Sequence, residues 1–256
     1  MSYLFDLHYL CRMYSHLDCI ALRTIKLSDS KNLLSAWSRQ LGRITFSFPA
    51  GQGREARRRR ALCPPLAIFS GVSDIKPGRE VLSLRDLSAA PGTIAISSSP
   101  AKNLSAMFLA EVLDILLRHS DSADAALSDF LFGSVEALGA LTDPAAIANF
   151  HIIFLYRLSH FAGIEPQLEG WNTHAIFDLR EGRFRTSLPF HRDFLQGREN
   201  TMLMAISRAD YRSAHRLPLS RDDRRRALDV ILQYFSFHLT PVGNLHSLEI
   251  LRELGD

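Results

Sequence analysis

Hydrophobic and polar residues alternate along the first third of the chain. In the stretch GRITFSFPA, Ile44, Phe46 and Phe48 fall on one face of an extended segment, and polar side chains fall on the other. Five segments rich in β-branched and aromatic residues follow one another here, separated by turn-forming or charged stretches. They predict five strands, over residues 18–27, 32–38, 42–50, 65–75 and 80–90.

The pattern changes to a helical period beyond residue 95. Residues 100–119 place Leu104, Phe108 and Ile115 on one stripe, and Ser99 is a candidate N-cap for this helix. Further helices are predicted over residues 123–141, 144–163 with a stop at Gly163, 201–216, 220–239 and 247–254.

A strand-turn-strand pattern interrupts the helices near residues 174–190, where REG is the turn. The fold class predicted is α+β: a five-stranded OB-fold β-barrel over residues 17–95, followed by a mainly α-helical domain over residues 96–256 that carries the hairpin. Residues 1–16 form an N-terminal extension, either an extra helix or the result of an over-early start assignment. They lack the basic start and the cleavage site of a signal peptide.

The composition indicates a globular protein that uses arginine in preference to lysine. The 256 residues are 46% hydrophobic and 22% charged, with a net charge of +3. Of the 30 basic residues only four are lysines, and arginine favours planar, forked contacts to phosphate or carboxylate. This bias points to an anionic partner.

Cysteine usage and hydropathy indicate the cellular compartment and exclude some kinds of site. Cys11, Cys19 and Cys63 form no CxxC pair, so neither a disulfide framework nor a four-thiolate zinc site can be written. A reducing cytoplasm fits this usage best. No run of about 18 apolar residues is found in the sequence, and we therefore expect no membrane partner.

An arginine cluster, REARRRR, lies between the third and fourth predicted strands. From Arg39 to Arg60 the sequence has seven arginines and a single acid, Glu55. Taken alone, such a run is typical of a solvated loop or of charges beside a hydrophobic strand. Here it links two strands of a barrel, and nucleic-acid-binding OB barrels combine cationic loops with exposed rings. Binding through it would be mostly electrostatic and insensitive to base sequence.

The aromatic residues of the barrel have a different expected role. Phe46 and Phe48 share the inward stripe with Ile44, which predicts core positions rather than base-stacking platforms. The sequence leaves the role of Trp37 open.

The order of motifs in the first 70 residues resembles a known family. An LRT strand is followed by an SDS turn, an LGR turn, a glycine, a basic stretch and the strand LCPPLAIF. This order is similar to the N-terminal barrel of the bacterial RecO family of recombination mediators. The resemblance continues through ANFHIIFLYRLSHFAGIEP, FDLREGRF and LHSLEILREL, so it extends from Leu17 to Leu254.

The resemblance implies a non-catalytic protein of DNA repair and recombination, cytoplasmic and associated with the nucleoid. Members bind single- and double-stranded DNA and anneal complementary strands. With RecR they help to load RecA onto strands covered by single-strand-binding protein (SSB), whose acidic C-terminal tail they recognise, and RecF is a further candidate partner. Carried onto this sequence, the candidate DNA contacts are Lys26, Lys31, Arg39, Arg43, Arg54, Arg57, Arg58, Arg59 and Arg60.

The sequence departs from the family pattern at its metal site. Many members carry a four-cysteine zinc insert in the helical domain, whereas the matching region here has no cysteine. His174 and His191 remain, but two isolated histidines do not make a zinc site. We therefore expect no zinc and no other cofactor.

A second basic segment covers residues 207–226, with seven arginines and three acids. Ser220 and Asp223 resemble a capping box, so part of this charge serves helix geometry and solvation. The alternative is a second DNA surface or the receptor for an acidic tail, formed by Arg208, Arg212, Arg216, Arg221, Arg224 and Arg225. Phe154 and Arg157 are a candidate pocket for the SSB tail only if they are exposed, since this apolar helix favours core packing.

The absence of common catalytic motifs favours a protein without enzymatic activity. The sequence contains no GxxxxGK[ST], GxGxxG, GxSxG or HExxH motif. Asp121, Asp124 and Asp129 are interpreted as helix caps. The alternative function is a protein-interaction scaffold, whose barrel docks acidic protein partners rather than nucleic acid.

Overall fold

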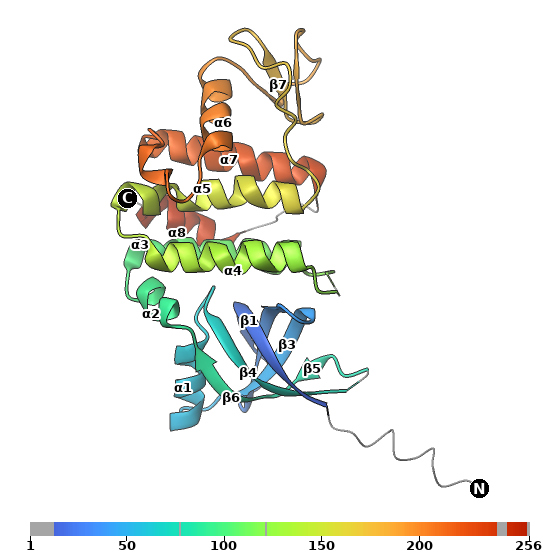
Figure 1. The fold of residues 1–256 in the computed structure, drawn as a ribbon, viewed down its shortest axis with the longest axis vertical. Coiled ribbons are helices and arrows are strands. Elements are labelled where there is room, and N and C mark those ends of the chain that lie inside the picture. The colour runs from blue at the N-terminus through green and yellow to red at the C-terminus, as the bar shows by residue number, and fades with distance from the viewer. Residues whose placement is uncertain (1–12, 77, 121, 240–244, 255–256) are drawn as a thin grey trace, which may run out of the picture. The chain divides into compact units, whose positions relative to one another are not determined.

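The chain folds into two compact units that alternate along the sequence. The computed structural model describes residues 13–76, 78–120, 122–239 and 245–254. Unit 1 comprises Met1–Ala95 and Leu117–Val135, and unit 2 comprises Ile96–Leu116 and Glu136–Asp256. Unit 1 contains a curled sheet and unit 2 contains most of the helices (Figure 1), so the α+β class predicted from the sequence is confirmed.

Unit 1 is built on a six-stranded sheet with the order β5-β3-β2-β1-β4-β6. The central strand β1 pairs antiparallel with β2 and with β4. Its register with β2 shifts between Ala21 and Arg23, and an irregularity of this kind bends a strand. The strands are β1 (Met13–Lys26), β2 (Lys31–Ser38), β3 (Gly42–Pro49), β4 (Ile68–Ile75), β5 (Val81–Leu82) and β6 (Leu84–Ala89).

One short segment of chain forms both edges of this sheet. Strand β5 pairs in parallel with β3, placing Val81 beside Thr45. Strand β6 pairs antiparallel with β4, placing Ala89 opposite Phe69. Only Ser83 separates β5 from β6, so the two edges meet there and the sheet curls towards a barrel. The sheet has six strands instead of the predicted five because residues 80–90 divide between two partners.

Strand β1 begins before the position that the sequence predicted. Met13 pairs with Ile75, and His16 pairs with Val72. Residues 13–16, which the sequence placed in an N-terminal extension, are therefore the first residues of the sheet. The rest of that extension, residues 1–12, lies outside the described residues.

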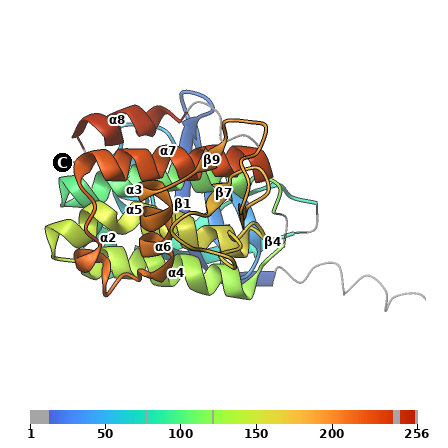
Figure 2. The same ribbon diagram turned by 90° about the horizontal axis from the view of Figure 1, so that it is seen from above.

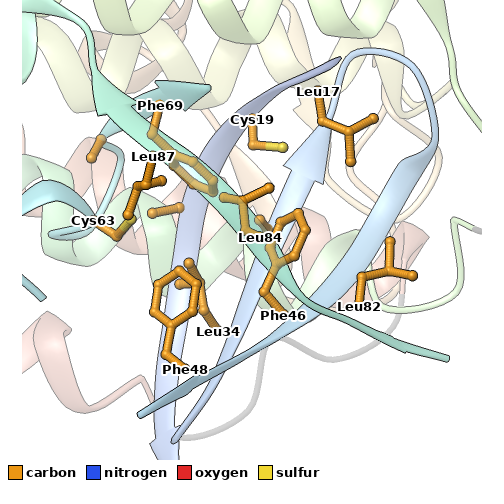
Figure 3. Close-up of a cluster of buried hydrophobic side chains, with 13 residues drawn as sticks. Leu17, Cys19, Leu34, Phe46, Phe48, Cys63, Phe69, Leu82, Leu84 and Leu87 are labelled. Atoms are coloured by element: carbon orange, nitrogen blue, oxygen red, sulfur yellow. The ribbon is translucent and has the colours of Figure 1, made fainter. Parts of the chain in front are cut away.

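The inner face of the curled sheet holds the hydrophobic core of unit 1, shown in Figure 3. The rings of Phe46 and Phe69 meet edge to face, with centroids 6.1 Å apart. Phe48 is also buried, so the prediction that Phe46 and Phe48 are core residues is confirmed. Trp37 is fully buried as well, and its indole Nε1 donates a hydrogen bond of 3.0 Å to Ser128 Oγ. It is not available as a stacking platform.

The predicted helices are present, and most of their boundaries are close to those expected. The helix predicted over residues 201–216 begins earlier and ends at Arg208, with a separate 3₁₀ helix at Ala214–Arg216, and α2 was not predicted. Asp143 caps α5 by accepting a hydrogen bond of 2.9 Å from the Ala146 amide, and Gly163 follows its end with a φ of +71°. The helices are α1 (Arg54–Leu62), α2 (Pro91–Ser97), α3 (Pro100–Leu116), α4 (Ala125–Ala140), α5 (Pro144–Phe161), α6 (Arg198–Arg208), α7 (Arg221–His238) and α8 (His246–Leu254).

Helix α5 lies at the centre of unit 2. Its residues Ile152 and Ile153 are fully buried in a cluster that also includes Ile206 of α6 and Ala227 of α7. Figures 1 and 2 show α5 and α7 side by side. The predicted hairpin is confirmed as β7 (Ile176–Asp178) and β8 (Arg183–Arg185), and a third strand that the sequence did not predict, β9 (Phe194–Leu195), completes the small sheet.

Replacing Gly42 by alanine should destabilise unit 1, because Gly42 has a φ of +74° and an added Cβ would lie 2.5 Å from the Ser122 carbonyl oxygen. Left-handed strain costs about 1–2 kcal/mol for a residue with a Cβ, and the clash adds to it. Gly78 is the matched control, because its φ is +77° and nothing lies within 4 Å of its added Cβ. Thermal unfolding should show a larger drop for Gly42→Ala than for Gly78→Ala. Equal drops would mean that Ser122 does not pack on the β2–β3 turn.

Candidate nucleic-acid interface

The arginine cluster forms a helix, α1 (Arg54–Leu62), and not the loop that the sequence predicted. Arginine and alanine both favour helix, so a run of these residues folds locally once glycines end the preceding strand segment. Gly53 is the extended N-cap residue, and Glu55 lies in the first turn, where the helix dipole favours an acid. Ala56 is the buried residue of this helix, which leaves most of the arginines facing outwards.

Arg59 fastens α1 to the barrel. Its Nε donates a hydrogen bond of 2.8 Å to Glu55, and its Nη1 donates one of 3.1 Å to the carbonyl of Leu84 in β6. Its guanidinium carbon lies 5.6 Å from the centre of the Phe48 ring. With 21% of its side chain exposed, Arg59 is the least accessible arginine of the helix. Its main contacts are therefore structural.

Glu55 is fixed by the arginines around it. The hydrogen bond from Arg59 is the main reason that the pKa of the Glu55 carboxyl is lowered, and the charge of Arg58 adds to the effect. Arg58 approaches Glu55 only to 3.9 Å, and 66% of its side chain is exposed. Glu55, the single acid of the cluster, is thus paired mainly with Arg59.

Four other arginines of α1 present their guanidinium groups to solvent, and we call them the arginine face: Arg54, Arg57, Arg58 and Arg60. Arg57 donates a hydrogen bond of 2.7 Å to the Gln52 carbonyl, and Arg60 donates one of 2.9 Å to the Gly51 carbonyl. Each arginine keeps further N–H donors for a ligand. Within the described residues, Arg54 has no partner for its side chain.

Two lysines from the β1–β2 hairpin extend the basic surface towards α1. Lys31 pairs with Pro49 across the sheet, and the next residue after Pro49 donates a backbone hydrogen bond of 3.0 Å to the Ser30 carbonyl. The hairpin tip therefore borders the segment that Arg60 contacts. Lys31 is exposed, whereas Lys26 is paired with Asp29 at 2.6 Å.

Two of the predicted DNA contacts, Arg39 and Arg43, are less available to a ligand than the arginine face. Arg39 donates a hydrogen bond to Asp129, and its guanidinium carbon lies 4.2 Å from the centre of the Phe132 ring. The interpretation of Asp129 as a helix cap was therefore wrong, because its carboxylate is engaged by Arg39. Asp124 does cap α4, since its side chain accepts a hydrogen bond of 2.9 Å from the Leu127 amide. Arg43 is half-buried.

The second basic segment, in unit 2, serves partly as structure. Ser220 and Asp223 form the predicted capping box at the start of α7. Arg226 pairs with Glu199 at 2.6 Å, and Arg224 donates a hydrogen bond of 2.9 Å to the Leu219 carbonyl. The exposed arginines of this segment include Arg208, Arg212, Arg216 and Arg221.

A small cavity of about 30 Å³ lies within unit 2 beside the start of α7, and we call it the histidine pocket. Its lining is arginine around an apolar base: His151, Arg221, Arg224, Arg225, Leu228, Leu251 and Arg252. His151 is 7% exposed, and its Nδ1 has no hydrogen-bond partner in the described part of the chain. Burial, followed by the charge of Arg224, lowers the pKa of this imidazole to about 4, so His151 is neutral at pH 7.

The sequence did not predict the histidine pocket, because His151 lies in a helix that is apolar almost all round. The pocket that the sequence did suggest needs an exposed Phe154, and Phe154 is 1% exposed. Arg157 beside it donates a hydrogen bond of 2.9 Å to the Ala209 carbonyl. Phe154 and Arg157 therefore do not form an accessible pocket, because the bundle packs around them.

Two kinds of feature are absent from the described residues. They contain no group of three or more histidine, cysteine or acidic residues placed to hold a metal ion. None of the helices described is both long enough and apolar enough to cross a membrane.

Arg59→Ala should lower the stability of the protein by about 1–2 kcal/mol, because it removes a charged hydrogen bond to the Leu84 carbonyl and the contact with Phe48. Arg58→Ala, on the same helix and beside the same glutamate, should change stability by less than about 0.5 kcal/mol, because Arg58 is exposed. Chemical denaturation of both variants measures the difference. Equal stabilities would show that Arg59 does not hold α1 on the barrel.

Comparison with known proteins identifies the family. A family model described as the C terminal of recombination protein O matches residues 97–249. DNA repair protein RecO of Porphyromonas gingivalis strain W83 is 32% identical over 241 residues, which cover 93% of this chain and 97% of that protein. DNA repair protein RecO of Bacteroides fragilis is 29% identical over 238 residues, with the same coverage of the two chains. This chain belongs to the RecO family.

Proposed function

We propose that this protein is a non-catalytic, DNA-binding recombination mediator. Membership of the RecO family assigns it to DNA repair and recombination. In the finer proposal it binds single- and double-stranded DNA, anneals complementary strands and, with RecR, helps to load RecA onto DNA covered by SSB. The observation that carries the DNA-binding part is the arginine face, a set of four exposed arginines on a helix that contacts β3 and β6 of the curled sheet.

The arginine face fits a phosphate backbone. Its four guanidinium groups lie within seven residues, which is about 9 Å of helix axis. Planar guanidinium donors match phosphate oxygens, and the nearest acid is engaged mainly by Arg59. The face can therefore offer several positive charges to one stretch of DNA. It offers no donors fixed against base edges, so recognition by this surface is independent of sequence.

Strand annealing follows from the same electrostatics. Two complementary strands repel each other through their phosphates, and a basic surface lowers that repulsion and raises their local concentration. Annealing by this mechanism needs no catalytic side chain. The scaffold alternative uses the same arginines to dock an acidic protein, and the two functions differ in how binding to an oligonucleotide depends on salt.

The histidine pocket supports a second proposed role, the binding of the acidic C-terminal tail of SSB: the cavity of about 30 Å³ takes the terminal carboxylate, and the rest of the tail lies on the surface around it. Such a tail ends in an apolar residue and a carboxylate, and it needs an apolar base with arginine at the rim. Leu228 and Leu251 supply the base, and Arg221 and Arg225 supply part of the rim. The neutral His151 adds a ring nitrogen that has no partner of its own among the described residues.

Converting the four residues of the arginine face to alanine should weaken binding to all DNA sequences alike. Removing one arginine–phosphate interaction lowers the slope of log affinity against log salt by about 0.7 for single strands, so removing four lowers it by about 2.8. The measurement is a pair of salt titrations, wild type and variant, on one fluorescent mixed-sequence oligonucleotide.

The matched control removes four exposed arginines from unit 2: Arg208, Arg212, Arg216 and Arg221. It changes the net charge equally, and we expect it to keep most of the DNA affinity. A larger loss in the control would place the DNA site on unit 2. If the arginine-face variant keeps the wild-type DNA affinity and salt slope, the arginine face is not the DNA site. If none of the proteins, wild type included, binds the oligonucleotide appreciably, the scaffold function is favoured.

The double variant Arg221→Ala, Arg224→Ala should weaken binding of a peptide with the SSB tail sequence by about a hundredfold or more, because charged hydrogen bonds to a carboxylate contribute about 1.5–3 kcal/mol each and two of them are lost. It should leave DNA affinity near wild type. The arginine-face variant should bind the peptide normally and lose DNA affinity. Fluorescence anisotropy with labelled peptide and labelled DNA measures both, and a double variant that binds peptide normally would reject the histidine pocket.

A further inference from the structure

A larger cavity lies between α1 and β6 in unit 1, and the functions above do not use it. Its volume is about 350 Å³, within the range of roughly 300–1,000 Å³ typical of small-molecule sites. Helix α1 forms one wall and β6 forms the other: Glu55, Arg58, Arg59 and Leu62 face Arg85, Asp86 and Leu87. We call it the α1–β6 cavity.

The charged groups around the cavity are not all satisfied by one another. Arg59 donates hydrogen bonds to the Glu55 carboxylate and to the Leu84 carbonyl. The charges of Arg59 and Glu55 therefore offset each other. Arg85 is exposed and has no carboxylate partner among the described residues; its guanidinium carbon lies 5.8 Å from the centre of the Tyr14 ring. Asp86 is also exposed, and the described part of the chain provides no partner for its side chain. The cavity thus offers both free donors and a free acceptor.

The apolar part of the lining decides which kind of ligand fits. Leu62 and Leu87 contribute apolar surface, with Leu87 8% exposed. A bare phosphate gains nothing from leucine side chains and is repelled by Asp86. A nucleobase has two apolar faces and an edge of donors and acceptors, and its flanking phosphates are anionic. The mixture of leucine, arginine and one free carboxylate therefore matches a nucleotide better than a phosphate.

Among the described residues, the barrel has few other places to hold a base. Single-strand-binding OB folds stack bases on exposed aromatic rings. Here Trp37, Phe46, Phe48 and Phe69 are buried, and Tyr14, which is 46% exposed, lies near Arg85. Guanidinium planes also stack on bases. The side chain of Arg85, at the rim of the cavity, can supply such a plane.

We propose that the α1–β6 cavity takes the base of an unpaired nucleotide in single-stranded DNA. The base rests on Leu62 and Leu87 beneath the Arg85 guanidinium, Asp86 accepts a hydrogen bond from an N–H group on the edge of the base, and the exposed Arg58 binds a flanking phosphate. A base in a duplex is stacked and paired, so it enters only if it is flipped out. The cavity therefore favours single-stranded over double-stranded DNA. This inference rests on the proposed DNA binding and deepens it.

The test compares Arg85→Ala with Arg79→Ala. Arg79 is the matched control because it is exposed, lies in the same unit, does not line the cavity and bonds the nearby Val81 carbonyl at 3.0 Å. Three labelled probes of equal length are titrated with each protein: a mixed-sequence single strand, the same strand with abasic residues, and a duplex. Arg85→Ala should weaken binding of the intact single strand by about tenfold, because stacking of one base accounts for roughly that factor. It should not weaken binding of the abasic strand or the duplex more than the control does.

Each other outcome rejects the cavity as a base site. Equal losses on intact strand, abasic strand and duplex would show that Arg85 only contacts phosphate. No loss on any probe would show that DNA does not reach the cavity. In both cases the wild type still binds DNA with a steep salt dependence, so the proposed function survives. Wild-type protein that binds none of the probes would overturn both.

Discussion

The structure of unit 1 depends on the way residues 81–89 join the two edges of the sheet. Val81 and Leu82 extend the edge at β3, and Leu84 to Ala89 extend the edge at β4. Because a single residue separates the two pairings, the sheet cannot lie flat, and its curvature encloses the phenylalanine-rich core. Helix α1 contacts β3 and β6, which belong to the two edges that this join brings together. The Leu84 carbonyl, at the join, is the acceptor that holds Arg59.

Arginine has two separate roles on this framework. Arg39 and Arg59 each combine a carboxylate partner with an aromatic ring, which gives the long side chain one defined position. The arginine face has few partners other than backbone carbonyls, so its guanidinium groups can reorganise around a flexible strand. Arg59 thus orders the helix on which the arginine face can meet a ligand. A count of basic residues does not distinguish these roles.

The parts of the fold that the sequence predicted are those fixed by local patterns. Strands β2 and β3 follow alternation because one of their faces is buried, and α5 and α7 follow from caps and a helical period. The division of residues 80–90 could not be predicted, because it depends on pairing with strands that are distant in sequence. The hydrogen bond from Arg39 to Asp129 could not be predicted for the same reason, because the two residues are 90 positions apart in the sequence.

Local signals were also misread or absent at the candidate sites. The alanines and arginines of α1 do favour helix, but the density of charge favoured a loop interpretation. His151 carries no local signal, because nothing in an apolar helix shows which single polar side chain meets arginines from α7 and α8. For Arg85 and Asp86 the only signal was a pair of adjacent charges within a predicted strand, and such pairs are common on exposed strand faces.

A mediator that anneals strands has to release its product, and the proposed sites differ in how they respond to pairing. Phosphates remain available when two strands pair, so the arginine face alone would hold a duplex at least as firmly as a single strand. A cavity that accepts a base only while the base is unpaired loses its ligand when the complementary strand arrives. The binding energy of the cavity then favours the single strand before annealing and disappears afterwards. A weak base site beside a non-specific phosphate surface therefore makes annealing and release parts of the same equilibrium.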